Sequence, residues 1–179
     1  LQILQSHYPT DAWVLKTPQH LWHLPALRER YPDARLVWMH RDPADVVTSV
    51  ASLNTSMHRQ NSDHTNPHAI AEQWIEKLHL AVSRGMAFDD ERGGEDWCFH
   101  LRYDDLMADP PGAVRKLYAH FGEEPSGLHT KRMELWMQER PQSAFGRHGY
   151  DPRDFGLTNE GTRERFASYI ERFAIPVGK

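Results

Sequence analysis

Trp13-Val14-Leu15-Lys16-Thr17-Pro18 and, further along the chain, Arg35-Leu36-Val37-Trp38-Met39-His40-Arg41-Asp42-Pro43 set the architecture that we expect of this protein. Each stretch is a short apolar run, rich in residues that favour β-strands, and each ends at a cation close to a helix-starting proline. They predict strands over residues 12–16 and 35–40. Between them, leucines at helical spacing predict a helix over about residues 20–30.

This order of elements is a βαβ unit, so the two strands are expected to be parallel and joined by a right-handed crossover. Lys16 and Arg41 would then lie at the same edge of one sheet. In open α/β proteins the edge outside the carboxyl ends of the strands is where ligands bind. Two cations beside helix N-termini favour an anion, so this edge is predicted to bind a phosphate or sulfate group.

The rest of the chain continues the alternation of helices with short strands. Pro43 stands at the preferred first position of a helix that runs to about Met57, with Val46, Val50 and Leu53 as its expected buried stripe. The other expected elements are a helix from Asn66-Pro67 to about Gly85, a loop over 89–96, a strand over 97–102, helices over 109–122 and 127–139, and a final helix capped by Thr158.

Strands that alternate with helices define an α/β fold with a parallel sheet and helices on both faces. Three strands make a thin sheet for so many helices. The chain also opens at Leu1, without a methionine, in a segment that resembles the end of a helix. We therefore expect residues 1–179 to be the C-terminal part of a longer domain whose first strand lies upstream of Leu1.

The composition is that of a globular protein, with 179 residues, 39% hydrophobic and 26% charged. A formal net charge of −4 argues against general binding to nucleic acid or to an anionic membrane, so a cationic site must be local. Cys98 is the only cysteine, which excludes a disulfide framework and favours a reducing compartment such as the cytoplasm. No apolar run is long enough to predict a membrane span.

Arg41 and Ser49 stand eight residues apart across a predicted strand-to-helix junction. Arginine carries a planar fork of donors that matches phosphate oxygens, and a serine on the accessible face of the helix adds a hydroxyl donor. The alternative is that Arg41 forms an ion pair with Asp42 or Asp45, a common arrangement near helix starts. The residue types leave both interpretations open, and Lys16 on the neighbouring predicted strand favours the binding site.

Two other patterns do not lead to a site. His40-Arg41-Asp42 is similar to the catalytic loop of protein kinases, but Val47 occupies the position of the metal-binding asparagine and no glycine-rich loop precedes it. The histidines between residues 58 and 68 include a pair at helical spacing. Pro67 sets a helix start within that pair, so we expect a solvated loop rather than a metal site.

Five segments carry a resemblance to a known family: Leu15–Leu21, Tyr31–Val37, His40–Ser49, Tyr103–Leu106 and His148–Leu157. Together they resemble the sulfotransferases that use 3′-phosphoadenosine 5′-phosphosulfate (PAPS). The resemblance extends over nearly the whole chain.

The resemblance implies a fold related to the P-loop nucleoside-triphosphate hydrolases and a role for several side chains. It implies that Arg41 and Ser49 hold the 3′-phosphate of the nucleotide, which is its most specific feature. Lys16 matches a lysine that contacts the sulfuryl group or the bridging oxygen, and Tyr103 matches a tyrosine near the nucleotide. The loop around Arg147 falls where the family closes over the nucleotide.

Two departures from the family pattern accompany the resemblance. The glycine- and serine-rich 5′-phosphosulfate loop (the P-loop of the fold) is absent from these residues and is expected upstream of Leu1. Pro18 occupies the position at which many cytosolic members carry a catalytic histidine, so His20 becomes the candidate base.

The implied function is transfer of a sulfuryl group from PAPS, without a metal, to a hydroxyl or amine of a small-molecule, glycan or lipid acceptor. The other product is adenosine 3′,5′-bisphosphate. Two alternatives stay open: a non-catalytic module that keeps the 3′-phosphate site, and a P-loop kinase-like phosphotransferase. The sequence identifies neither the acceptor nor the oligomeric state.

Overall fold

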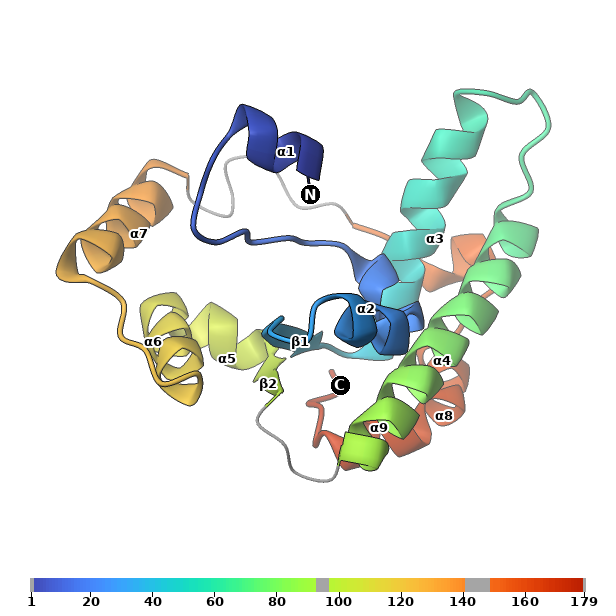
Figure 1. Ribbon diagram of the computed structural model, residues 1–179. Helices are drawn as coiled ribbons and strands as arrows, with labels where there is room; N and C mark the ends of the chain where they lie inside the picture. Colours follow the sequence, from blue (N-terminus) through green and yellow to red (C-terminus); the bar gives the residue numbers. More distant parts are fainter. Residues whose placement is uncertain (1, 93–96, 141–148, 179) are drawn as a thin grey trace.

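The computed structural model describes residues 2–92, 97–140 and 149–178, which surround two short parallel strands (Figure 1). The strands are β1 (Leu36–His40) and β2 (Cys98–Arg102). The helices are α1 (Gln2–His7), α2 (Leu24–Arg30), α3 (Pro43–Arg59), α4 (Pro67–Arg92), α5 (Tyr103–Ala108), α6 (Pro110–His120), α7 (Gly127–Glu139), α8 (Asn159–Arg165) and α9 (Ala167–Arg172), with the 3₁₀ turns η1 (Pro18–Trp22) and η3 (Pro152–Phe155).

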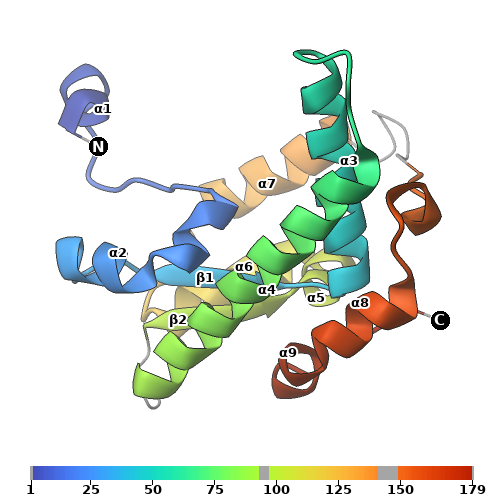
Figure 2. The ribbon, with the colours of Figure 1, turned by 90° about the vertical axis from the view of Figure 1, so that its right-hand side faces the viewer.

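The predicted α/β fold, with a parallel sheet and helices on both faces, is confirmed. β1 and β2 pair in parallel and are joined through α3 and α4, because parallel neighbours need a crossover connection. On one face Trp38 lies 5.1 Å, centroid to centroid, from Phe173 just after α9. On the other face the Phe99 ring lies 5.3 Å from His120 at the end of α6. Figure 2 shows α4 running across this sheet with α3 beside it.

The core lies where β1 meets α4 and α9, and one glycine sets how closely they approach. The core includes Leu24, Trp38, Phe88 and Tyr169, all buried. A Cβ added at Gly85 of α4 would lie 2.6 Å from Cη2 of Trp38, which is too close for any real side chain. The crossing of α4 over β1 therefore requires glycine at this position.

The βαβ unit predicted near the start of the chain is wrong. Residues 12–16 form no strand but an extended segment, in which the Val14 side chain is 97% exposed. The partner of β1 is β2, so Lys16 does not end a strand next to Arg41. Strand-forming residues make a strand only where a neighbouring strand completes their hydrogen bonds, and none of the described residues does so here.

Three helices also differ from their predictions. The helix expected over 20–30 divides at His23 into η1 and α2, because Pro25 in the first turn of α2 cannot continue a preceding helix. α4 continues through Gly85 to Arg92, into part of the expected loop at 89–96; residues 93–96 lie outside the described residues.

The buried face of α3 is the third difference. Leu53, expected in the buried stripe, is 60% exposed, whereas Val47 and Ala51 are buried. α3 packs closely against α4, where Ala71 is also fully buried. Small side chains permit this close approach, so they form the contact in place of larger apolar residues.

The single final helix expected after Thr158 is instead two helices, α8 and α9, which divide at Phe166. The other predicted elements are confirmed. β1, β2, α6 and α7 lie within a residue or two of their expected bounds, and Thr158 caps α8 by accepting a hydrogen bond of 3.1 Å from the N–H of Gly161. Among the described helices, none combines the length and the apolar character that crossing a membrane requires.

Candidate functional site

A cavity of about 250 Å³ opens at the carboxyl end of β1. Its walls are residues 40–42 with Asp45 at the β1–α3 junction, Tyr103 and Asp104 at the start of α5, and residues 175–178 near the C-terminus. Whole small-molecule sites commonly enclose about 300–1,000 Å³. The cavity therefore has room for part of a ligand of nucleotide size.

Arg41 and Tyr103 meet in this cavity because of the strand register. His40 pairs with Arg102 at the ends of the two strands, so the next residues of each strand lie side by side. The Arg41 guanidinium lies 4.5 Å from the centroid of the Tyr103 ring, and its Nη2 lies 3.0 Å from Oδ2 of Asp45. The cation is thus held between an aromatic face and a carboxylate, with 41% of its side chain exposed.

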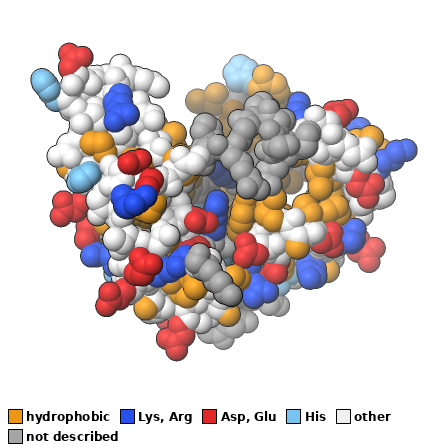
Figure 3. All heavy atoms as spheres, turned by 180° about the vertical axis from the view of Figure 1, so that it is seen from behind, with side chains coloured by type: hydrophobic (Ala, Val, Ile, Leu, Met, Phe, Trp, Pro, Cys, Tyr) orange, Lys and Arg blue, Asp and Glu red, His pale blue; other side chains and the backbone are white. Residues whose placement is uncertain are grey.

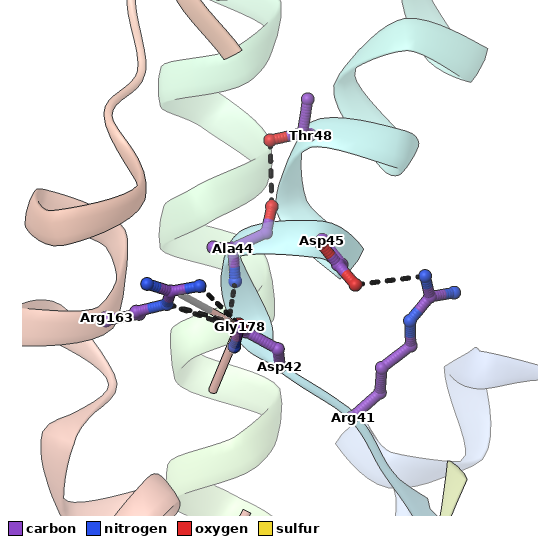
Figure 4. A network of polar contacts seen from close by, with 7 residues as sticks. All are labelled: Arg41, Asp42, Ala44, Asp45, Thr48, Arg163 and Gly178. Carbon is purple, nitrogen blue, oxygen red and sulfur yellow. Dashed lines mark hydrogen bonds and ion pairs between the residues drawn. The ribbon is translucent and has the colours of Figure 1, made fainter. Parts of the chain in front are cut away.

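Asp42, the next residue, joins three segments of the chain (Figure 4). Its carboxylate caps α3 by accepting a hydrogen bond of 3.0 Å from the N–H of Ala44. It also accepts bonds from Arg163 of α8, at 3.1 Å from Nε and 2.8 Å from Nη2, and from the N–H of Gly178 at 3.3 Å. Burial disfavours its charge, but these donors outweigh burial and lower the pKa of Asp42.

At the α3 N-terminus the N–H of Ala44 already donates to the carboxylate of Asp42, so this donor is not free for the anion that the sequence predicts at this edge. Among the described residues that line the cavity, Arg41 is the only arginine or lysine and stands against Asp42, Asp45 and Asp104. An anion that binds Arg41 here therefore competes with the carboxylate of Asp45.

The predicted nucleotide-binding residues are brought together only in part. Arg41 and Tyr103 share the cavity. The predicted alternative for Arg41, an ion pair, is confirmed for Asp45. Ser49 is half-buried on α3, about two helical turns beyond Asp42, and does not line the cavity.

The predicted catalytic residues lie outside the cavity lining. Lys16 is exposed in the extended segment before η1, and His20 is half-buried within η1, which packs on α4. Arg147 lies outside the described residues. The structure thus leaves the roles of Lys16, His20 and Arg147 as predictions.

Sequence reasoning missed a buried polar cluster behind the cavity. His40 is 2% exposed, its Nδ1 lies 3.1 Å from Oη of Tyr169, and its Nε2 lies 2.9 Å from Nδ1 of His100. Burial, and secondarily the charge of His100, lowers the pKa of His40 to about 3. The alternation of β1 places His40 on the same face as Trp38, which was a usable sign that this histidine points inward.

Metal-ligating residues do not gather within residues 2–92, 97–140 and 149–178. No three His, Cys, Asp or Glu side chains there are arranged to hold an ion.

These features define the class of protein: it has a P-loop-like α/β fold with an exposed arginine at the carboxyl edge of its parallel strands. The chain belongs to the sulfotransferase family, whose model matches residues 1–126. The crystal structure of the sulfotransferase STF9 from Mycobacterium avium is similar at 31% identity with a TM-score of 0.85, over 98% of this chain and 45% of that one. The crystal structure of STF1 from Mycobacterium tuberculosis H37Rv is similar at 30% identity with a TM-score of 0.66, over 87% of this chain and 39% of that one.

A similar protein of known activity is the omega-hydroxy-beta-dihydromenaquinone-9 sulfotransferase Stf3 of Mycobacterium bovis and Mycobacterium tuberculosis. It is 28% identical over 163 residues, which are 89% of this chain and 40% of Stf3. The chain therefore spans less than half the length of each of these relatives.

Proposed function

We propose that this chain forms part of a site that binds PAPS and transfers its sulfuryl group to an acceptor hydroxyl or amine. One observation carries the proposal: in a member of the sulfotransferase family, the strand register holds the exposed guanidinium of Arg41 over Tyr103 at the carboxyl edge of the sheet. A rigid fork of donors suits a phosphate dianion, and the neighbouring ring offers an apolar face to a nucleoside.

In this proposal Arg41 exchanges the carboxylate of Asp45 for the 3′-phosphate of the nucleotide. The exchange costs little, because an exposed ion pair between residues i and i+4 contributes only about 0.3–0.5 kcal/mol. Ser49 adds its hydroxyl as a second donor from α3. Arg147 closes over the bound nucleotide.

The reaction is an in-line displacement at sulfur. His20 accepts the proton of the acceptor hydroxyl as the new S–O bond forms. Lys16 neutralises the charge that develops on the bridging oxygen as the bond from sulfur to the leaving 5′-phosphate breaks. A phosphosulfate loop upstream of Leu1 supplies the backbone donors for that phosphate.

We further propose an acceptor hydroxyl carried on an apolar, lipid-like body. Two features support this. Stf3 is named for a modified menaquinone, a lipid. Next to Lys16, the apolar side chains of Val14 and Leu15 are 97% and 48% exposed, and further exposed apolar side chains lie on α7, in the half of the molecule where orange spheres gather in Figure 3.

The cytoplasm is the proposed compartment, which suits a buried, unpaired Cys98.

The proposal is tested by calorimetric titration of adenosine 3′,5′-bisphosphate and of adenosine 5′-phosphate into the protein. We expect binding that requires the 3′-phosphate and that falls about tenfold or more in Arg41→Ala, since a charged donor to phosphate is lost. Arg35→Ala is a matched control: Arg35 also stands beside β1, pairs with Glu123 and lies 5.4 Å from an aromatic ring centroid. The Arg35→Ala variant should bind the bisphosphate as tightly as the wild type does.

The other functions predict different outcomes. Binding of the bisphosphate without sulfuryl transfer, in a protein that includes the upstream phosphosulfate loop, would favour the non-catalytic module. Phosphoryl transfer from ATP in the presence of Mg²⁺ would favour the phosphotransferase. Failure of the bisphosphate to bind with and without that loop contradicts the proposed function.

A further inference from the structure

The segment that follows α9, residues 174–178, turns back to the cavity that holds Arg41. Two backbone hydrogen bonds close the end of α9: the N–H of Ala174 donates to the carbonyl of Glu171 at 3.2 Å, and that of Ile175 donates to the carbonyl of Ile170 at 3.0 Å. This pair of bonds is the Schellman arrangement, in which one residue after the helix takes a left-handed backbone conformation. Ala174 is that residue, with a φ of 46°.

Contacts beyond Ala174 hold it in this conformation. Glycine is the usual residue at such a position, because a Cβ crowds the backbone in the left-handed region. Ile175 is 5% exposed and belongs to the hydrophobic core. Three residues further on, the N–H of Gly178 donates to Oδ2 of Asp42 at 3.3 Å, beside the bonds from Arg163 (Figure 4). The segment is thus fixed at both of its ends.

Between these two fixed ends, Pro176 and Val177 form an apolar wall of the cavity. Both residues line it and both are exposed, with Val177 at 44%. The lining on the other side is mostly charged, since it consists of Arg41 and three aspartates around the ring of Tyr103. The Arg41 guanidinium already covers one face of that ring. The cavity therefore has a cationic side at the β1–α3 junction and an apolar side after α9.

We propose that Pro176 and Val177 are the surface against which the nucleoside of the bound nucleotide packs while Arg41 binds its 3′-phosphate. Apolar surface gains free energy when it leaves water, and a phosphate gains most beside the cation. A ligand that has both parts therefore binds best in one direction across the cavity. The apolar wall would select a nucleotide over a smaller anion such as pyrophosphate. The identity of this ligand rests on the proposed function.

Asp42 is the positioning residue for the apolar wall. It follows Arg41 directly in the chain, so its bond to Gly178 ties the wall to the neighbour of the cation. Burial disfavours the charge of Asp42, but the donors around it outweigh burial and lower its pKa. The carboxylate is therefore ionised at neutral pH and keeps this bond. One side chain thus sets the separation between the cationic and the apolar side of the cavity.

The first test is NMR of the full chain with ¹³C-labelled valine methyl groups, titrated with adenosine 3′,5′-bisphosphate. We expect nuclear Overhauser effects between the Val177 methyl protons and the ribose or adenine protons of the ligand. Val37 is the control, because it is 43% exposed but lies on the opposite face of β1 from His40 and outside the cavity lining. It should show no such effects.

The outcomes separate this proposal from the proposed function. Bisphosphate that binds without contacts to Val177 would overturn the apolar wall and leave the proposed function standing. If the bisphosphate does not bind the wild type at all, the proposed function fails and the assignment of the wall to a nucleoside fails with it.

Affinities measured by calorimetry then distinguish the two parts of the ligand. Val177→Ala removes apolar contact area, so we expect bisphosphate to bind about threefold more weakly. Binding of pyrophosphate, which has no nucleoside, should stay unchanged. Val37→Ala, matched in exposure, should change neither affinity. Unchanged bisphosphate binding by Val177→Ala, or an equal loss for both ligands, would contradict the proposal.

Two variants of Gly178 test the bond to Asp42. Gly178→Pro removes the N–H donor, whereas Gly178→Ala keeps it and places a Cβ in ordinary contact with Nη2 of Arg163, at 3.5 Å. We expect bisphosphate binding about three- to fivefold weaker, and the effects at Val177 lost, in Gly178→Pro alone. Urea unfolding midpoints equal to that of the wild type would show that the fold persists. Wild-type binding by Gly178→Pro would overturn the positioning role of Asp42.

Discussion

Replacing Asp42 by alanine tests how the cavity wall is held together. One carboxylate caps α3 at Ala44 and binds Arg163 of α8 and the N–H of Gly178. Arg163 and Gly178 lie more than 120 residues away along the chain, so the side chain closes a long loop as well as a helix end. Asp42→Ala removes all three contacts at once.

The expected loss in the free energy of unfolding has two contributions, one from the helix cap and one from the ion pair. Loss of the N-cap costs about 1 kcal/mol of the free energy of unfolding. Removing one partner of a buried ion pair costs about 3–5 kcal/mol, but Arg163 keeps 22% of its side chain exposed, so water compensates in part. We expect a total loss of about 3–4 kcal/mol for Asp42→Ala. Asp42→Asn retains the cap but not the charge, and should lose about half as much.

Urea unfolding followed by tryptophan fluorescence measures this loss, because Trp38 and Trp97 are both buried. Asp109→Ala is the matched control. Asp109 caps α6 at the N–H of Gly112, at 2.9 Å, and forms no ion pair within the described part of the chain, so its removal should cost about 1 kcal/mol. If Asp42→Ala costs no more than Asp109→Ala, the reasoning about the ion pair is refuted.

Three further outcomes are expected. Lowering the pH from 7 to 5 should lower the free energy of unfolding by about 2 kcal/mol through His40, because folding lowers its pKa from 6.5 to about 3 and only the unfolded state gains a proton. Urea unfolding at both pH values measures this loss. Asp45→Ala should strengthen bisphosphate binding about twofold in calorimetry at low salt, because Arg41 no longer has to leave a carboxylate. Gly85→Ala should cost about 2 kcal/mol in thermal unfolding, because its Cβ meets Trp38 although alanine favours helices.

Each has its control. In His40→Gln the free energy of unfolding should no longer show this dependence on pH, whereas His7→Gln, at an exposed position, should keep it. Equal pH dependence in the wild type and both variants would contradict the first outcome. The Asp45→Ala effect should vanish in 1 M salt, where surface charges are screened. Gly127→Ala has no heavy atom within 4 Å of its new Cβ and should not destabilise, and a stable Gly85→Ala would disprove the close contact.

Much of the fold follows from interactions between residues close in the chain. The alternation that buries Trp38 and His40, the Asp42-Pro43 start of α3 and the Thr158 cap of α8 were all open to prediction, because propensity, period and capping act within a few residues. The error at residues 12–16 has the opposite cause. Their composition is that of a strand, but no described strand pairs with them.

In the candidate site, too, some features follow from residues close in the chain and others depend on the tertiary structure. The residue types around Arg41 pointed to an anion and to a family, because a fork of donors beside a helix start is a local feature. Tyr103 reaches Arg41 only through the β1–β2 register, and Arg163 and Tyr169 reach this edge from more than 120 residues away. Such contacts depend on which surfaces pack together and exclude water, and that is settled by the whole chain when it folds rather than by any one stretch of it.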